Sequence, residues 1–260
     1  MTKKRYFTYL SYNGKCYCGW QNQPNGISVQ QKIEEAISTL LQKKISITGA
    51  GRTDAGVHAA AMVAHFDWWG DDLDLGFICK RLNCMLPHDI AIQKIVPVVQ
   101  EGHARFSAMS RTYKYYITQK KNPFHHDFSC RIYPQLDFVA MHQAAQCLLE
   151  YTDFTSFSKV HTDVKTNNCK IHQAGWEYVD EMWVFTIQAD RFLRNMVRAI
   201  VGTMLEVGRG KCSLPEFRQV IEAKDRGKAG SSAFAQALFL CDIEYPKDIF
   251  MNVTDLEIKE

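Results

Sequence analysis

The chain has 260 residues, of which 46% are hydrophobic and 23% are charged, and its formal net charge is +3. Such a composition is typical of a globular protein of one large or two modest domains, and the charge is too small by itself to indicate nucleic-acid binding. The sequence has no apolar run of membrane-spanning length and no signal-peptide core at its start, so we expect a cytoplasmic protein without a membrane segment. Its nine scattered cysteines contain no CxxC pair and predict neither a disulfide framework nor a zinc ribbon.

The first half of the chain has the element order β-α-β-β-α-β. Apolar residues that alternate with polar ones indicate strands, and apolar residues at helical spacing indicate helices. In chain order, the predicted elements are a strand at 5–12, a helix at 29–43 with Ser28 as its N-cap, a strand at Ile45 and Ile47, a strand at 62–66, a helix from about Asp74 that ends before Pro87, and a strand at 90–98.

The second half repeats this order. Its predicted elements are a strand at 112–118, a helix that Asp137 caps, a hairpin of strands at 171–179 and 182–189, helices at 193–207 and 214–223, and a strand at 238–245. Two such units in succession predict an α+β fold of two ferredoxin-like β-α-β-β-α-β domains with antiparallel sheets. We place the N-terminal domain at 1–105, the C-terminal domain at 106–246 and a tail at 247–260.

The stretch GAGRTDAGVHAAAMVAHF, residues 49–66, concentrates glycines and reactive side chains. Its glycines do not fit the GxGxxG pattern, and the chain has no Walker loop, so a nucleotide cofactor is not expected. Asp54, His58, His65 and Asp67 could supply metal ligands, but the two histidines are seven residues apart across a change from loop to strand. Nothing in this spacing places them on one face, so we predict no metal site.

A simple turn is the main alternative for this stretch. Asp54, Ala55 and Gly56 are typical turn residues, because the aspartate can bond to the backbone ahead and glycine tolerates a positive φ. A loop that only reverses the chain has no need of Arg52, Thr53 and His58 as well. From spacing alone, Asp54 is either a turn residue or a reactive carboxylate.

GRTDAGVHA, residues 51–59, resembles the signature of the tRNA pseudouridine synthase A family. Further blocks follow in that family's order over residues 6–246. They are Gly19-Trp20-Gln21 with Gln23, HARFSA at 103–108, Tyr113 with Tyr115, DFTSF at 153–157, FLRNMVRAIVG at 192–202 and AFAQALFL before Cys241. The resemblance implies two ferredoxin-like domains whose sheets merge around a basic cleft.

The resemblance also implies the activity and the partners. Members isomerise uridine to pseudouridine at positions 38, 39 and 40 of the tRNA anticodon arm, and they act as homodimers. The reaction is redox-neutral, so no cofactor or metal is expected. Because the target uridine is stacked within RNA, it must be flipped out into the enzyme.

Three residues are implied to be catalytic. Asp54 matches the family's nucleophilic aspartate, and burial alone would raise the pKa of its carboxyl. Arg198 matches the arginine whose guanidinium offsets this effect. Tyr113 matches the tyrosine that lies against the target base as the candidate general base, whereas Tyr115 is expected to fill a packing role.

Other residues are implied to bind the substrate. Arg52 matches the residue that holds the flipped nucleotide or its phosphate, and Leu238 matches an apolar position of the base pocket, with ordinary strand packing as the alternative. Trp20 and Gln21 are expected to shape the cleft rim or the domain packing. The basic residues expected to line an RNA groove, with incidental surface charge as the alternative, are Arg191, Arg194, Arg209, Lys120 and Lys121.

Two positions depart from the family pattern. Ala199 stands where the family has asparagine, and Ala237 stands where glycine is usual.

Two competing functions also stay open at this point. One is a non-catalytic RNA-binding protein, although an RNP1-type aromatic pattern is not evident, and the other is a metal-dependent hydrolase built on His58 and His65.

Overall fold

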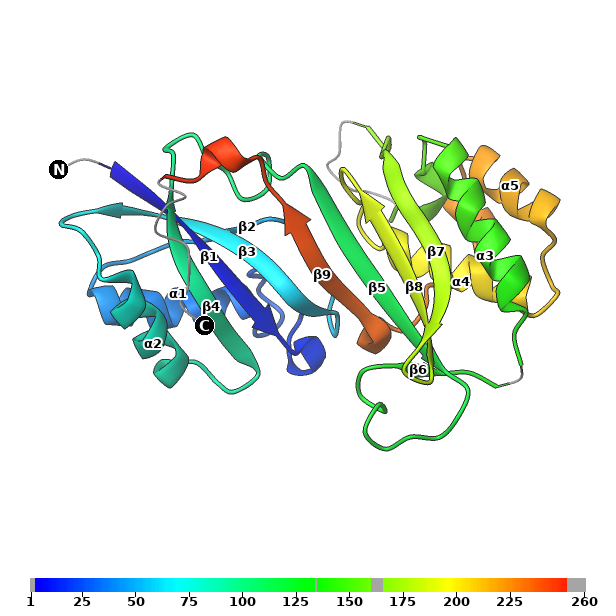
Figure 1. Cartoon of the computed structure of the whole chain (residues 1–260), viewed down its shortest axis with the longest axis horizontal. Coiled ribbons are helices and arrows are strands. Elements are labelled where there is room, and N and C mark those ends of the chain that lie inside the picture. Colours follow the sequence, from blue (N-terminus) through cyan, green and yellow to red (C-terminus); the bar gives the residue numbers. More distant parts are fainter. Residues whose placement is uncertain (1–2, 134, 160–165, 252–260) are drawn as a thin grey trace. The chain divides into compact units, whose positions relative to one another are not determined.

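The computed structural model describes residues 3–133, 135–159 and 166–251 of the chain, which pack into two compact units (Figure 1). Of the described residues, the first unit contains 3–55, Ala59–Met109 and 242–251. The second contains Gly56–His58 and Ser110–Cys241. The expected domain limits at 105/106 and 246/247 stay a prediction.

Three long antiparallel strands form the sheet of the first unit. β1 (Lys3–Tyr12) lies between β3 (His58–Trp69) and β4 (Ile90–Val98), and a short β2 (Thr48–Gly49) pairs with β3. In the register of these strands, Tyr6 is opposite both Phe66 and Pro97. The buried core of this sheet includes Phe7, Leu10 and Met62.

Two helices accompany this sheet, and each begins at a predicted cap. The Ser28 hydroxyl accepts from the Gln31 N–H at the start of α1 (Val29–Leu41), and Asp74 accepts from the Phe77 N–H at the start of α2 (Leu75–Met85). These bonds satisfy N–H groups that have no partner within the helix. Figure 1 shows both helices beside the strands of this unit, with α2 packed on β4.

The second unit is also built of strands and helices. β8 (Met182–Ala189) lies between β5 (Ser110–Thr118) and β7 (Ile171–Val179) in antiparallel pairing, whereas the short β6 (Cys130–Arg131) runs parallel to β5. β9 (Leu238–Glu244) spans the division, with its residues to Cys241 in this unit.

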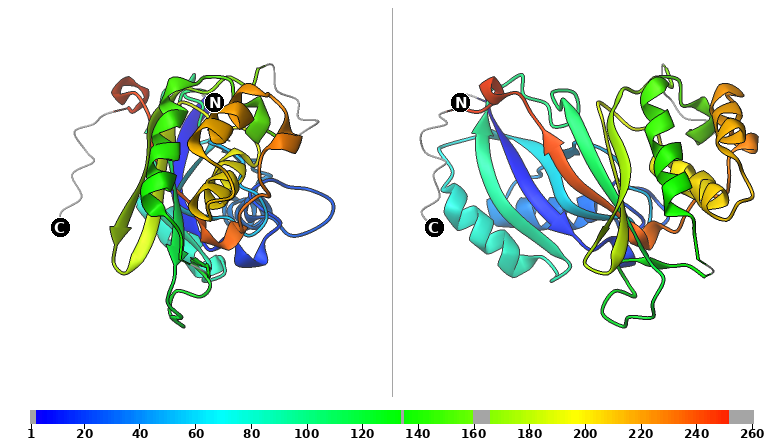
Figure 2. Two further views of the ribbon diagram at one scale, coloured as in Figure 1. Left: turned by 90° about the vertical axis from the view of Figure 1, so that its right-hand side faces the viewer. Right: turned by 45° about the vertical axis from the view of Figure 1, so that its right-hand side comes forward.

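The helices of the second unit are α3 (Phe138–Cys147), α4 (Met196–Gly208) and α5 (Leu214–Glu222). Both views in Figure 2 show these three helices as one group. Almost every residue of α4 is buried, so it is the central helix against which α3 and α5 pack. Short 3₁₀ helices complete the chain at Gly14–Cys16, Leu148–Glu150, Thr155–Phe157, Arg226–Lys228, Ala235–Ala237 and Lys247–Ile249.

In the part of the chain that the structure describes, the mostly antiparallel strands and five α-helices confirm a mixed α and β protein, while the twin ferredoxin-like architecture stays a prediction. Two predicted elements were wrong in detail. Ile45 and Ile47 are buried but lie outside any strand, because only Thr48 and Gly49 reach the β3 ladder. α4 begins three residues later than predicted, because Asn195 has a left-handed φ of 67° that cannot continue a helix.

Candidate active site

The loop that carries Asp54 leaves the sheet of the first unit between β2 and β3. Its base is closed by the ladder in which Gly49 faces Ala64, and by a 2.8 Å hydrogen bond from the Ala50 N–H to the Val63 carbonyl. Gly56, with a φ of 78°, supplies the predicted turn in a conformation that glycine adopts without strain. Asp54 therefore lies on a loop with an ordered base.

The Gly19-Trp20 segment supports this loop from within the same unit. The Trp20 N–H donates to the Thr53 carbonyl at 3.3 Å, and the Trp20 ring, 2% exposed, lies where a side chain on Gly49 would stand. The Thr53 carbonyl in turn occupies the space that a Cβ on Gly19 would need. Trp20 is thus buried within this unit, while the expectation that it shapes the cleft rim or the domain packing stays a prediction.

A pair of buried hydroxyl groups fixes the residue next to the aspartate. The Thr53 hydroxyl lies 2.8 Å from the Tyr12 hydroxyl at the end of β1, and both side chains are buried. With Thr53 held inward, Arg52 is exposed and Asp54 is half-buried. The Tyr12 contact was not predicted, because the alternation of β1 gives no signal for a hydroxyl partner 41 residues away.

His58 is a packed histidine of the second unit. Its Nε2 lies 3.1 Å from the Gln236 carbonyl, and its ring stacks on Phe239 at 4.6 Å and meets Phe128 edge-on. Burial lowers the pKa of His58, which favours the neutral ring. Within residues 3–133, 135–159 and 166–251, no group of three or more His, Cys, Asp or Glu side chains could hold a metal ion.

Tyr113 and Tyr115 lie on β5, opposite Ile187 and Phe185 of β8. Tyr113 is 8% exposed and meets Phe192 edge-on, with 5.0 Å between ring centroids. Tyr115 is completely buried, and this burial raises the pKa of its hydroxyl well above the usual range. Tyr115 therefore has the packing environment expected of it, and Tyr113 keeps a little of its surface accessible.

Arg198 lies on α4 in the second unit and is held through a two-way contact with Ala233. Its Nε donates to the Ala233 carbonyl at 2.8 Å, and the Ala233 N–H donates back to the Arg198 carbonyl at 2.9 Å. The positive charge of Arg198 also opposes the upward pKa shift of Tyr115. Backbone hydrogen bonds therefore position the Arg198 guanidinium. It lies close enough to β5 for its charge to interact with the buried Tyr115.

Leu238 is the first residue of β9 and is 5% exposed, which is also what ordinary strand packing would give. The two departures from the family pattern are fully buried. Ala199 lies inside α4, where its carbonyl accepts from the Thr203 hydroxyl, and Ala237 ends the 3₁₀ turn before β9.

The five basic residues expected to bind RNA all belong to the second unit but do not form one cluster. Lys120 and Lys121 follow the last residue of β5, whereas Arg191 and Arg194 follow the last residue of β8. These strands are antiparallel, so about 20 Å of ladder separates the two pairs. Arg209, which follows the C-terminal end of α4, forms an ion pair with Glu206 at 2.6 Å, and Lys120 lies 3.5 Å from Glu181.

Comparison with known proteins identifies the class of protein that these features define. The sequence profile of the tRNA pseudouridine synthase family matches residues 10–107 and 144–246. The chain belongs to this family and is an isomerase of the pseudouridine synthase class.

Among the residues that the structure describes, no helix is long and apolar enough to cross a membrane.

Individual relatives agree over nearly the whole chain. The tRNA pseudouridine synthase A of Parabacteroides distasonis is 62% identical over 247 residues, which cover 95% of this chain and 98% of that protein. The protein of the same name from Bacteroides fragilis is 58% identical, with 96% and 100% covered. The one from Chlorobium luteolum is 38% identical, with 92% and 94% covered.

Proposed function

We propose that this protein converts uridine to pseudouridine at positions 38, 39 and 40 in the anticodon stem-loop of tRNA. Relatives named tRNA pseudouridine synthase A that match almost all of the chain support the substrate. The observation that carries the chemical part is the anchored Thr53, which leaves the neighbouring Asp54 half-buried on a well-supported loop. A reactive carboxylate needs such fixed presentation, because misplacement by a single ångström lowers rates strongly.

The proposed reaction balances within the nucleoside. The N1–C1′ bond breaks, the uracil turns, a C5–C1′ bond forms, the C5 proton leaves and N1 takes up a proton. Asp54 acts as the nucleophile, Arg198 as the cationic partner of its carboxylate, and Tyr113 as the general base, directly or through water. These roles rest on the positions that match the family's motifs.

The target uridine enters the enzyme by base flipping in this proposal. A base stacked in an RNA stem or loop is out of reach of a side chain, so it must leave the stack. Arg52, exposed next to the buried Thr53, holds the flipped nucleotide or its phosphate, and Leu238 packs against the base. Lys120, Lys121, Arg191, Arg194 and Arg209 contribute phosphate contacts along the arm.

Asp54→Asn tests the catalytic assignment. With an unmodified tRNA transcript that has uridines at the three positions, we expect the variant to bind tRNA like the wild type while pseudouridine formation falls on the order of 10³-fold or more. Asp71→Asn, which alters an exposed aspartate of the same unit, should keep full activity. If the wild type forms no pseudouridine, the protein is instead a non-catalytic RNA-binding protein.

Mapping pseudouridine in the product tests the substrate position separately. Product at other tRNA positions would contradict the anticodon assignment and leave the isomerase intact. We also infer a homodimer from the resemblance alone. Sedimentation of the purified protein tests it, and a monomeric mass at the concentration of full activity would contradict it.

A further inference from the structure

The turn of residues 103–107, between β4 and β5 in the first unit, presents an aromatic ring to solvent. Phe106 is 76% exposed, and the Arg105 guanidinium lies over it, 5.6 Å from the ring centroid. Arg105 is exposed as well. A phenylalanine in this environment forgoes the stabilisation that burial gives, so a turn that served only to connect two strands would not favour it.

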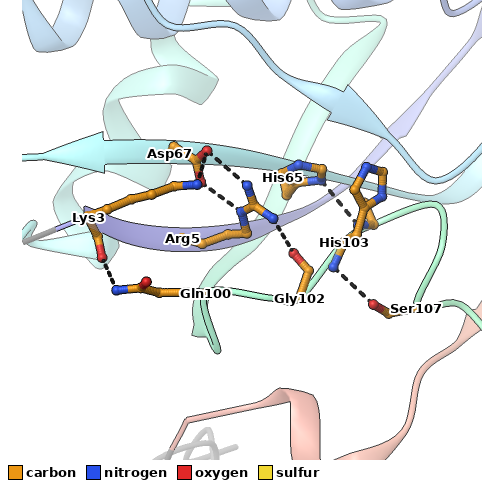
Figure 3. A network of polar contacts seen from close by, with 9 residues as sticks. Lys3, Arg5, His65, Asp67, Gln100, Gly102, His103 and Ser107 are labelled. Atoms are coloured by element: carbon orange, nitrogen blue, oxygen red, sulfur yellow. Dashed lines mark hydrogen bonds and ion pairs between the residues drawn. The ribbon is translucent and has the colours of Figure 1, made fainter.

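His103 holds the backbone of this turn. Its Nδ1 accepts from the N–H groups of Arg105 at 3.1 Å and Phe106 at 3.3 Å. The His103 N–H donates to the Ser107 hydroxyl at 3.0 Å (Figure 3). The Ser107 N–H donates to the His103 carbonyl at 2.9 Å. The His103 ring also packs against Phe106, with 4.3 Å between centroids. The direction of the exposed ring is therefore fixed.

The sheet of the first unit anchors the turn in its place. The Ala104 N–H donates to His65 Nδ1 at 3.1 Å, and the Tyr245 hydroxyl donates to the Ala104 carbonyl at 2.6 Å. Arg5 of β1 donates to the Gly102 carbonyl at 2.9 Å (Figure 3). Ala104 is completely buried although Arg105 and Phe106 on its C-terminal side are exposed. The turn therefore holds the side chains of Arg105 and Phe106 in fixed positions that face solvent.

The two histidines that hold this turn, His65 and His103, must be neutral to do so. Each uses Nδ1 as an acceptor, which an imidazolium cannot do. Burial, followed by the nearby Arg5 charge, lowers the pKa of His65 to about 4 and also lowers that of His103. The turn therefore stays formed at neutral pH.

We propose that Phe106 and Arg105 form an RNA-contact site, in which the Phe106 ring stacks on an unpaired base of the tRNA and the Arg105 guanidinium binds an adjacent phosphate. Every base has a π-face, so a fixed aromatic ring binds without demanding a sequence, and arginine matches phosphate oxygens. The immobilised ring loses little freedom on binding. This inference rests on the proposed function only in taking tRNA as the substrate.

Variants of Phe106 in the full chain test the stacking. With a fluorescent, unmodified tRNA transcript measured by anisotropy, we expect Phe106→Ala and Phe106→Leu to raise Kd about tenfold, and Phe106→Trp to stay within about twofold of the wild type. The matched control is Phe77→Ala, which removes a 55% exposed phenylalanine from α2 of the same unit and should leave Kd unchanged. Circular dichroism confirms that each variant is folded.

The arginine has an independent readout. Arg105→Gln should lower the slope of log K against log salt concentration by about 1, as loss of one phosphate contact requires. Arg81→Gln, an exposed arginine on α2 of the same unit, should keep the slope of the wild type.

One result would overturn the site, namely a Phe106→Ala variant that binds tRNA with the Kd of the wild type. If that variant also loses self-association in sedimentation, the ring belongs to an interface between copies instead. Failure of the proposed function is distinguishable, since wild-type protein that binds tRNA without forming pseudouridine still gives the Kd comparison.

Discussion

The carbonyl oxygen of Thr53 fills the space where a Cβ on Gly19 would stand, and Gly19 itself has a φ of 94°. Two constraints thus meet at one residue, because L-residues other than glycine rarely adopt this conformation and no side chain fits beside the loop. The close approach lets the Trp20 N–H reach the Thr53 carbonyl. The residue before Asp54 is therefore positioned by a glycine more than thirty residues earlier in the sequence.

Gly19→Ala should damage both the fold and the reaction. The left-handed backbone and the contact with Thr53 predict a loss of about 2 kcal/mol or more in the free energy of unfolding, with a lower kcat because the Asp54 loop shifts. Urea unfolding and single-turnover assays measure the two effects. Gly51→Ala is the control for stability, because a Cβ there meets nothing within 4 Å. Equal stability of Gly19→Ala and the wild type would contradict the prediction.

Tyr113→Phe should separate chemistry from packing. The phenyl ring keeps the edge-on contact with Phe192, so we expect a stable protein with an unchanged Kd for tRNA. Loss of a general base should lower kcat about 10²-fold or more. The control is Tyr115→Phe, two residues along the same strand and fully buried, for which kcat should change by less than about threefold. A normal kcat for Tyr113→Phe would remove Tyr113 from the reaction.

Arg198→Lys should keep the charge and lose the positioning. Lysine has no equivalent of the Nε–H that donates to the Ala233 carbonyl, so its ammonium is no longer held in one direction. We expect kcat to fall about 10²-fold with KM little changed. Arg226→Lys is the matched control, since Arg226 also donates to backbone carbonyls, those of Ala229 and Gly230, in the same unit. Equal losses in the two variants would point to a structural role for Arg198.

The stability of the first unit should decrease in mild acid because of His65. Its pKa is about 4 in the fold and about 6.5 in an unfolded chain, so between these values the unfolded chain binds more protons. The stabilisation is present above pH 6.5 and is lost as the pH falls toward 4, by about 3 kcal/mol at most. Denaturant unfolding at several pH values measures this slope.

His65→Gln should flatten this slope, because the glutamine oxygen can accept from the Ala104 N–H and does not titrate. The lowered pKa of His103 and His58 should leave a smaller slope of the same sign. His88→Gln, an exposed histidine of the same unit, serves as the control and should behave like the wild type. An unaltered slope in His65→Gln would assign the acid sensitivity to other groups.

The local elements were predictable because their determinants are close in sequence. Ser28 and Asp74 cap their helices through N–H groups three residues ahead, and the alternation at residues 90–98 gave the observed bounds of β4. The family could likewise be predicted from the RTDAG stretch, because its motif is contiguous in the sequence. The same reasoning placed Ile45 and Ile47 in a strand, because local alternation cannot show where a partner strand stops.

What supports the candidate site depended on residues far apart in the chain. The sequence by itself determined the helices, most of the strands and the family, because each rests on local hydrogen bonds, periodic apolarity or a contiguous motif. It also singled out Asp54 as the candidate nucleophile, which stays a prediction. Only the tertiary structure decided that Tyr12 and Gly19 hold Thr53 in place. It also decided that the Ala233 carbonyl positions the Arg198 side chain. In the same way, His65 and His103 hold the turn that carries Phe106. The physical reason is that these contacts exist only after strands and turns distant in sequence have packed together, and no local pattern encodes them.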